Sequence, residues 1–306
     1  MEDPAAGPSA TADDPSHDPY AAPRPVAGPE DCAFYHTVDL PGLGVIRGMW
    51  DHRATAPEYL GNVSVTGKRV LEVGAASGFF TFWMESQGAE VVGYDLSDKQ
   101  DWDIVPYEGS DIEAAVAKRR NHIRQLNNSW WLGHRATSSK ARVVYGSTYE
   151  IPAAIGDVDI ATFGNILRHV RDPFLALERA LALTTETVVV TESGFHGNRL
   201  APRLARRFSM LGQAATRLRL PLYYTRGPSM TFVPDHREQY PYETWWYISP
   251  VAIKRFIGVL GFDRAEVSYH FQQREGGGMV PNFTVVGRRT GAGKIGRVNP
   301  AMPRLT

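Results

Sequence analysis

A glycine-containing turn between Glu72 and Gly78 has the residue types of a loop that binds a nucleotide-like ligand. The turn has the pattern E-x-G-x-x-x-G, follows the apolar run Arg69–Val73, and precedes a helical pattern that opens at Phe79. The glycines, Gly74 and Gly78, let the backbone turn sharply and let a ligand approach the chain closely. Open parallel sheets bind ligands at the carboxyl ends of their strands, so this turn predicts a cofactor site.

An acid and a missing glycine narrow the class of cofactor. Asp95 ends the next apolar run, about 20 residues further on, where its carboxylate can accept hydrogen bonds from both hydroxyls of a ribose. The dinucleotide fingerprint G-x-G-x-x-G is not met, because Ala76 stands at the second glycine position. A pyrophosphate needs that close approach, whereas a nucleoside without phosphate does not. The pattern therefore favours S-adenosylmethionine (SAM) over NAD.

His169 and Glu192 are the candidate catalytic residues, and each follows an expected strand, Val158–Phe163 or Thr187–Thr191. Methyl transfer from a sulfonium is an in-line displacement, in which alignment contributes most and a general base helps if the acceptor is a hydroxyl or an acidic carbon. The ordinary pKa of a histidine suits that base, so His169 is the first candidate. Alternatively, His169 caps or packs the helix expected from Pro173. Glu192 either acts on the substrate or serves as a helix-capping or ion-paired acid.

Substrate contacts are expected from two regions of the chain. Before the first strand these are His36, Trp50 and Arg53, with packing of an N-terminal helix as the alternative. Residues 193–234 contain seven arginines and no Asp or Glu, with leucines at helical spacing. This basic amphipathic segment predicts a lid helix, an anion site or a membrane contact. The substrate-binding candidates in this segment and after it are Arg203, Tyr224, His236, Trp245 and Trp246. The alternative is that these side chains pack inside the core of the lid.

Apolar runs that alternate with helical patterns must position these groups. The expected strands are Arg69–Val73, Glu90–Tyr94, Arg142–Tyr145, Val158–Phe163, Thr187–Thr191, Arg264–Tyr269 and Asn282–Gly287. Such alternation is typical of a parallel sheet, and the Gly-rich connection at 276–278 suggests a terminal antiparallel hairpin. We predict an α/β fold with a Rossmann-like, seven-stranded, mostly parallel sheet and a helical lid or insertion. Ser110 and Glu113 fit a capping box that opens a helix in the first insertion.

Composition also suggests how the chain is divided. Residues 1–31 are rich in Pro, Ala, Asp and Gly, and we expect a disordered tail there. The other expected parts are an N-terminal cap at 32–65, a cofactor-binding domain at 66–290 with insertions at about 97–140 and 194–246, and a flexible tail at 291–306.

Charge and cysteine content argue against several classes of protein. The formal net charge is zero, so no overall field attracts nucleic acid or membrane. The single cysteine, Cys32, cannot form an internal disulfide, and no metal site is expected. No apolar run reaches the length of a membrane span, and the first residues do not resemble a signal peptide. We therefore expect a cytoplasmic protein.

Five blocks of the sequence resemble the SAM-dependent methyltransferases related to the bacterial enzyme that carboxymethylates the wobble uridine of tRNA. The blocks are residues 34–41, 48–53, 66–74, 165–173 and 243–246, and the resemblance covers about residues 34–288. It implies a class I methyltransferase fold with SAM as the cofactor. Many members of this wider group look like methyltransferases of small molecules.

The resemblance also implies roles for single residues. Glu72, Gly74 and Gly78 would line the methionine end, Asp95 would hold the ribose, Ser147 and Thr148 would lie by the adenine, and Asn165 and Ile166 would close the pocket, with Ala75 and Leu96 as further cofactor contacts. Arg168 stands where this branch usually has Tyr before His. In the tRNA enzyme that Tyr helps to hold the extra carboxylate of carboxy-SAM. Its absence favours ordinary SAM, although an arginine could also bind a carboxylate.

These observations predict an enzyme that transfers a methyl group from SAM to a small anionic or hydroxylated metabolite, such as a natural-product intermediate. Long insertions and a neutral chain suit a closed pocket for a small molecule. The first alternative is tRNA wobble modification, for which we would expect a broad basic face rather than one basic segment. The second alternative is a non-catalytic SAM-binding partner subunit.

Overall fold

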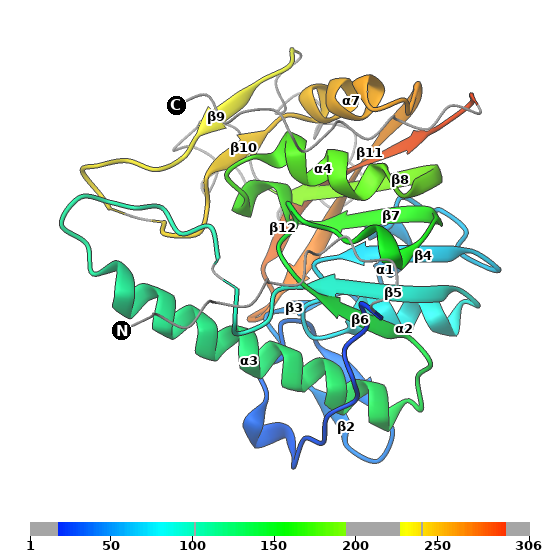
Figure 1. Ribbon diagram of the computed structural model, residues 1–306, viewed down its shortest axis with the longest axis vertical. Helices are drawn as coiled ribbons and strands as arrows, with labels where there is room; N and C mark the ends of the chain where they lie inside the picture. Colours follow the sequence, from blue (N-terminus) through cyan, green and yellow to red (C-terminus); the bar gives the residue numbers. More distant parts are fainter. Residues whose placement is uncertain (1–17, 101, 194–226, 240, 292–306) are drawn as a thin grey trace, which may run out of the picture.

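The computed structural model describes residues 18–100, 102–193, 227–239 and 241–291. Its centre is an eight-stranded sheet in the order β3-β11-β12-β8-β7-β4-β5-β6 (Figure 1). The strands are β3 (Trp50–Asp51), β4 (Arg69–Val73), β5 (Glu90–Asp95), β6 (Arg142–Tyr145), β7 (Val158–Gly164), β8 (Thr184–Ser193), β11 (Arg264–Arg274) and β12 (Met279–Arg288). The prediction of a Rossmann-like, mostly parallel sheet is confirmed, and the two-residue strand β3 is added at one edge.

Strand directions show where this sheet can bind a ligand. Strand β4 is parallel to β5 on one side and to β7 on the other, and the β5–β6 and β7–β8 pairs are also parallel. The chain therefore builds the sheet outward from β4 in both directions, and the strand order reverses between β4 and β7. A crevice forms at the carboxyl ends of strands at such a reversal. Strand β12 is antiparallel to β8 and β11, so the predicted terminal hairpin is confirmed.

Helices cover both faces of the sheet. They are α1 (Ala56–Tyr59), α2 (Phe79–Ser86), α3 (Ile112–Ala136), α4 (Pro173–Leu181) and α7 (Pro250–Val259), with 3₁₀ helices η1 (Pro29–Asp31), η2 (Ala153–Ile155) and η3 (Leu167–His169). Helices α4 and α7 pack on one face, and α1, α2 and α3 pack on the other, which gives two apolar core layers (Figure 1). Two small antiparallel sheets pair β1 (Val38–Leu40) with β2 (Gly44–Ile46) and β9 (Met230–Phe232) with β10 (Trp246–Ile248). No helix in the described ranges is long and apolar enough to cross a membrane.

The start of helix α3 differs from the predicted capping box. Its N-cap is Asp111, whose Oδ1 accepts a hydrogen bond of 2.9 Å from the Ala114 amide. Ser110, the predicted cap, instead donates its hydroxyl to the Tyr107 carbonyl at 2.6 Å. The prediction was wrong by one residue, because two adjacent residues could both cap and a carboxylate is a strong acceptor for the third helical amide.

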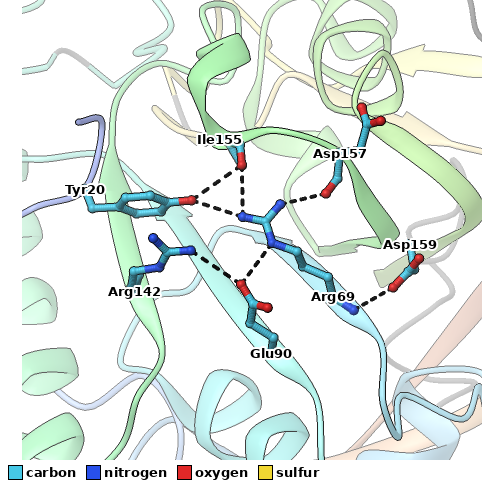
Figure 2. A network of polar contacts seen from close by, with 7 residues as sticks. All are labelled: Tyr20, Arg69, Glu90, Arg142, Ile155, Asp157 and Asp159. Carbon is cyan, nitrogen blue, oxygen red and sulfur yellow. Dashed lines mark hydrogen bonds and ion pairs between the residues drawn. The ribbon is translucent and has the colours of Figure 1, made fainter. Parts of the chain in front are cut away.

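The segment before the first strand packs across the amino ends of the sheet strands, as Figure 2 shows. The Tyr20 hydroxyl accepts a hydrogen bond of 3.1 Å from Arg69, and the guanidinium of Arg142 lies 3.8 Å from the centre of the Tyr20 ring. Arg69 and Arg142 both form ion pairs with Glu90, at 3.0 and 3.4 Å. Arg69 also donates to the Ile155 carbonyl at 2.9 Å, so one arginine links four segments of the chain.

These contacts correct the boundary of the expected N-terminal tail. Residues 18–31 do not form a free tail: Val26 is buried, and the Ala21 amide donates to the Val143 carbonyl at 2.8 Å. The reason is that two larger side chains, Tyr20 and Val26, anchor a segment that otherwise consists mostly of small residues and prolines. Residues 1–17 and 292–306, for which tails were also expected, lie outside the described residues.

Candidate active site

The loop after β4 has a backbone shape that requires glycine. Gly74 has φ of +87° and Gly78 has φ of +86°, where a residue with a β-carbon is strained. A β-carbon on Gly74 would lie only 2.2 Å from Cδ1 of Ile166. Gly74 and Ile166 both line a cavity at the carboxyl ends of the strands, so a side chain at position 74 would displace Ile166 within the site.

Asp95, at the end of β5, ties the loop to the neighbouring strand. Its Oδ2 accepts a 2.6 Å hydrogen bond from the Ala76 amide, and its Oδ1 accepts a 2.7 Å bond from the Leu96 amide. Burial raises the pKa of Asp95 to about 6, and the two amide hydrogen bonds act against that rise. Asp95 lines the cavity, and each carboxylate oxygen has a second acceptor position available for a ligand hydroxyl.

Glu72 is a buried carboxyl group below the loop. It accepts a hydrogen bond from the Thr81 hydroxyl, which in turn accepts one of 3.2 Å from the indole of Trp130. Burial raises the pKa of Glu72 to about 8, the Thr81 hydrogen bond lowers it, and the charge of Asp95 raises it further. Near neutral pH this group is therefore largely protonated in the ligand-free protein.

A cavity of about 610 Å³ runs along the carboxyl edge of the sheet. This volume falls in the usual range for small-molecule sites. Most of the expected cofactor residues line it: Glu72, Gly74, Asp95, Leu96, Ser147, Thr148, Asn165 and Ile166. Ala75 and Gly78 are outside the described lining; Ala75 is buried and Gly78 is the N-cap of α2.

Asn165 holds the loop after β7 in an unusual conformation. Its φ is +57°, its Oδ1 accepts a 2.7 Å hydrogen bond from the Ser193 amide, and its Nδ2 donates to the Tyr59 hydroxyl at 3.0 Å. The Tyr59 ring stacks on Phe80, with ring centres 4.5 Å apart. Tyr59 lines the cavity and was not singled out from the sequence, because its helix α1 has only four residues and carries no pattern.

His169 lines the cavity with one ring nitrogen already engaged. Its Nδ1 is hydrogen bonded to the carbonyl oxygen of Glu243, which can only accept, so Nδ1 carries the proton. Nε2 of the neutral ring then keeps its lone pair. Burial lowers the pKa of His169 to about 4, and the positive charge of Arg168 adds to that effect. At neutral pH the imidazole is therefore uncharged.

Glu192, the second catalytic candidate, lies outside the described lining of the cavity. It is buried, and its Oε1 accepts a 2.8 Å hydrogen bond from the Leu167 amide. Burial raises its pKa to about 7, while the charge of Arg168 lowers it. Its contacts are those of a group that fixes the turn η3, and through it the position of His169.

The residues before β4 separate into two groups. His36 and Trp50 line the cavity, and the backbone amide of His36 donates to the Ser77 hydroxyl in the glycine loop at 3.2 Å. The side chain of His36 is buried, and its Nδ1 has no hydrogen-bond partner within the described part of the chain. Arg53 forms an exposed ion pair of 2.8 Å with Asp51 and is outside the described lining. The structure therefore does not bring Arg53 into the site.

Trp245 and Trp246, which were expected to contact the substrate, instead form hydrogen bonds that hold the loops around the site. Trp245 donates to the Asp103 carbonyl at 2.7 Å, and Trp246 donates to the Arg171 carbonyl at 3.0 Å. Neither belongs to the described lining of the cavity, and the His236 side chain is 87% exposed. Arg203 and Tyr224 lie outside the described residues.

Several residues that line the cavity were not predicted from the sequence. Arg119 forms a 2.6 Å ion pair with Glu243, and Tyr35 and Arg274 line the end of the cavity near β3 and β11. Arg274 ends a strand that is five residues longer than the expected run Arg264–Tyr269. The alternation of that run breaks down at the polar residues after Tyr269, so the sequence pattern did not reach the functional end of the strand.

The fold and site together define the class of protein. Counted by their order in the chain, the seven long strands lie in the order 3-2-1-4-5-7-6, with an antiparallel seventh strand, as in class I methyltransferases. A family model described as a methyltransferase domain matches residues 52–227, more than half of the chain. The chain belongs to this methyltransferase family, which confirms the predicted class of enzyme.

Solved structures that match the chain have low sequence identity to it. The N-terminal domain of EvdMO1 with S-adenosylhomocysteine (SAH) bound is 17% identical to the chain. The match covers 83% of this chain and 90% of the EvdMO1 domain, with a TM-score of 0.45. Magnesium protoporphyrin IX methyltransferase from Synechocystis PCC 6803 with bound SAH is 10% identical, with coverages of 78% and 81% and a TM-score of 0.43. The 1,6-didemethyltoxoflavin-N1-methyltransferase of Burkholderia thailandensis is 14% identical to the chain, and the match covers 78% of each chain with a TM-score of 0.41. No curated protein sequence matches the chain significantly.

Proposed function

We propose that this protein transfers a methyl group from SAM to a small anionic or hydroxylated molecule. The observation that carries the proposal is the single cavity that joins the glycine loop and Asp95 to a chamber lined by aromatic and arginine side chains. One end therefore suits a nucleoside and the other suits an acceptor. The methyltransferase family of residues 52–227 supports the reaction type.

The residues at the first end fit SAM. Asp95 has free acceptor positions for ribose hydroxyls, and Ser147 and Thr148 line the part of the cavity after β6, where the adenine would lie. The space beside Gly74, which has no β-carbon, is filled by the side chain of Ile166, so Gly74 and Ile166 together shape the wall of the cavity where the methionine part would lie. Binding a cation next to Glu72 would favour its ionised form and lower its pKa from the raised value of the free protein.

The protein's own contribution to the reaction is alignment and removal of one proton. When bound, SAM supplies an electrophilic methyl group on a positively charged sulfur. A hydroxyl acceptor would lose a proton as its oxygen takes the methyl group and SAH leaves. We assign that proton to Nε2 of His169, because its Nδ1 is anchored on the Glu243 carbonyl. Glu192 positions the turn that carries His169.

Calorimetric titration of SAH into the purified protein tests the proposal. We expect micromolar binding, which Asp95→Ala abolishes, because the change removes the ribose acceptor and the tie to Ala76. Asp39→Ala, an exposed position on β1, is the matched control and should leave the affinity unchanged. Absence of SAH binding to the wild-type protein, at concentrations where it is folded, would refute the proposal.

Release of SAH from SAM in the presence of candidate acceptors then separates the functions still in competition. Turnover of small carboxylates or phenols is the expected result. Turnover of bulk tRNA, with binding that weakens steeply as salt rises, would instead place the protein in the wobble-uridine branch. SAH binding with turnover only after a second chain is added would identify a partner subunit.

A further inference from the structure

Two arginines lie at the end of the cavity opposite the nucleoside end. We propose that Arg274 and Arg168 form a binding site for the carboxylate of an aromatic acceptor, and that this site selects the substrate. The inference rests on the proposed methyl transfer and adds the chemical class of the acceptor. Both arginines line the cavity: Arg274 is the last residue of β11, and Arg168 lies in η3, which follows β7.

Register shows that Arg274 projects beyond the sheet. His270 on β11 lies opposite Asn282, which lies opposite Ser193 on β8. Arg274 is therefore four residues past the level of Ser193, or about 13 Å at the usual rise per residue of a strand. The β11–β12 hairpin thus forms a wall above the carboxyl edge, and Arg274 sits on that wall.

The strand order separates this wall from the cofactor loop. Four strand spacings lie between β4, which carries the loop, and β11, which carries Arg274, so the strands are about 19 Å apart across the sheet. Asp95, on β5, is one strand further away. Arg274 therefore belongs to the acceptor end of the cavity. Arg168 follows β7, but its side chain reaches the end of β8, two strands from β11, where it donates to the Ser193 hydroxyl.

The positive charge at this end is incompletely neutralised. Among the described residues, Arg274 forms no ion pair, and Nε of Arg168 is buried without a hydrogen-bond partner. One other nitrogen of Arg168 donates to the Ser193 hydroxyl at 2.9 Å, and buried Glu192 offsets part of its charge. A ligand carboxylate would complete this charge balance, because guanidinium and carboxylate groups match in geometry.

The acids elsewhere in the cavity have other partners. Glu243 pairs with Arg119, and Asp103 accepts hydrogen bonds from the Tyr149 hydroxyl and the Arg171 amide. They are therefore not available to neutralise the two arginines. An anion that enters the cavity meets unpaired positive charge only at the Arg274 end, within the described lining.

Tyr35 lies at the same end of the cavity as Arg274 and helps to define the shape of the ligand. Burial raises the pKa of its hydroxyl, while a hydrogen bond with the Trp50 side chain and the positive charges of Arg168 and Arg274 lower it. The backbone also places Tyr35 at this end: Trp50 lies opposite Arg274 in the β3–β11 pair, and the Trp50 amide donates to the Tyr35 carbonyl at 3.1 Å. Phe34, Tyr35 and Trp50 line this end with aromatic rings, which suits a flat acceptor.

Benzoate and its neutral analogue benzamide are the probes for this site. We titrate each into SAH-saturated protein and expect benzoate to bind at least tenfold more tightly, because only benzoate carries the charge. In Arg274→Gln the affinity for benzoate should fall about tenfold, the value of one charge-assisted hydrogen bond. Arg264→Gln, at the opposite end of the same strand and also exposed, should change nothing.

The outcomes of these titrations are distinct. Equal affinities for benzoate and benzamide, or no binding of either, would overturn the carboxylate site. An Arg274→Gln variant that loses SAH affinity but keeps benzoate affinity would overturn it too, because the arginine would then serve the cofactor. Failure of the wild-type protein to bind SAH would refute the proposed methyl transfer instead. Benzoate is therefore also titrated without SAH, so the two failures can be told apart.

Discussion

The two ends of the cavity are built in different ways. At the nucleoside end, the groups come from residues at or just after the carboxyl ends of β4, β5 and β6, and the loop is held by backbone amides bonded to Asp95. At the acceptor end, the lining comes from the segment before β4, from η3 and from the tip of β11. The first end is local in sequence, whereas the second joins segments more than 200 residues apart.

This difference suggests which changes each end tolerates. A site built from backbone groups and glycine conformation binds an invariant ligand, and a side-chain change there disturbs the fold and the cofactor together. A site built from side chains on a cap, a turn and a hairpin can change its ligand without disturbing the sheet. Variants should therefore fall into two groups, those that alter SAH affinity and those that alter only acceptor turnover.

The largest expected effect that separates the two groups is that of His169→Ala. Loss of the proton acceptor should lower turnover of a hydroxyl acceptor by about 100-fold or more, with SAH affinity unchanged. The rate of the wild-type enzyme should be independent of His169 ionisation from pH 6 to 8, because its pKa is about 4. Steady-state rates and SAH titrations measure the two parts.

His236→Ala is the matched control for that change, because the side chain is 87% exposed. Its turnover should equal that of the wild type. Near-normal turnover of His169→Ala would remove it as the base, and would make His36 the next histidine to test, because its Nδ1 lacks a partner among the described residues.

The nucleoside end was also the part most accessible from sequence. Gly74 and Asp95 were recognised because a sharp turn and a strand end leave local marks, and the strands β4 and β6 had the expected bounds. Periodicity also identified the terminal hairpin, because burial on a sheet face imposes alternation. The N-cap of α3 was predicted one residue too early, because Ser110 and Asp111 can both cap a helix. Strand β3 was not predicted, because two residues carry no periodic pattern.

The acceptor end could not be predicted, because it depends on which segments meet in space. Arg53 and Arg274 look alike as sequence features, yet Arg53 pairs with Asp51 at the surface and Arg274 lines the cavity. Trp245 and Trp246 have the composition of a binding site but donate to loop carbonyls. Residue type alone does not distinguish such roles; strand register and burial do.

A smaller effect is expected from Gly74→Ala, which tests whether the loop geometry serves the ligand. The β-carbon would meet Ile166 at 2.2 Å, so SAH affinity should fall about tenfold. Gly42→Ala is the control, because its φ of +78° imposes the same strain while no atom lies within 4 Å. Both variants should lose about 1 kcal/mol of stability from that strain, measured by denaturant unfolding. Equal SAH affinity in the two variants would show that the packing of Ile166 on Gly74 does not shape the cofactor site.

Glu72→Gln should change how stability depends on pH. In the unfolded chain Glu72 ionises near its ordinary pKa, whereas in the folded protein it ionises at about 8. Between these values the folded state binds more protons, so Glu72 makes the ligand-free protein less stable as pH rises. Relative to the wild type, Glu72→Gln should therefore gain about 1 kcal/mol or more between pH 5 and 8. Urea unfolding at a series of pH values measures this difference, and a constant difference would show that Glu72 ionises normally.

The smallest effect is expected from Arg53→Gln, which tests the boundary of the acceptor end. Arg53 pairs with Asp51 at 2.8 Å, but its side chain is 40% exposed, and exposed ion pairs contribute at most about 1 kcal/mol. The stability should change by less than that, and the Michaelis constant for an acidic acceptor should not change. A several-fold rise in that constant, with SAH affinity intact, would extend the acceptor site from Arg274 across β3 to the outer edge of the sheet.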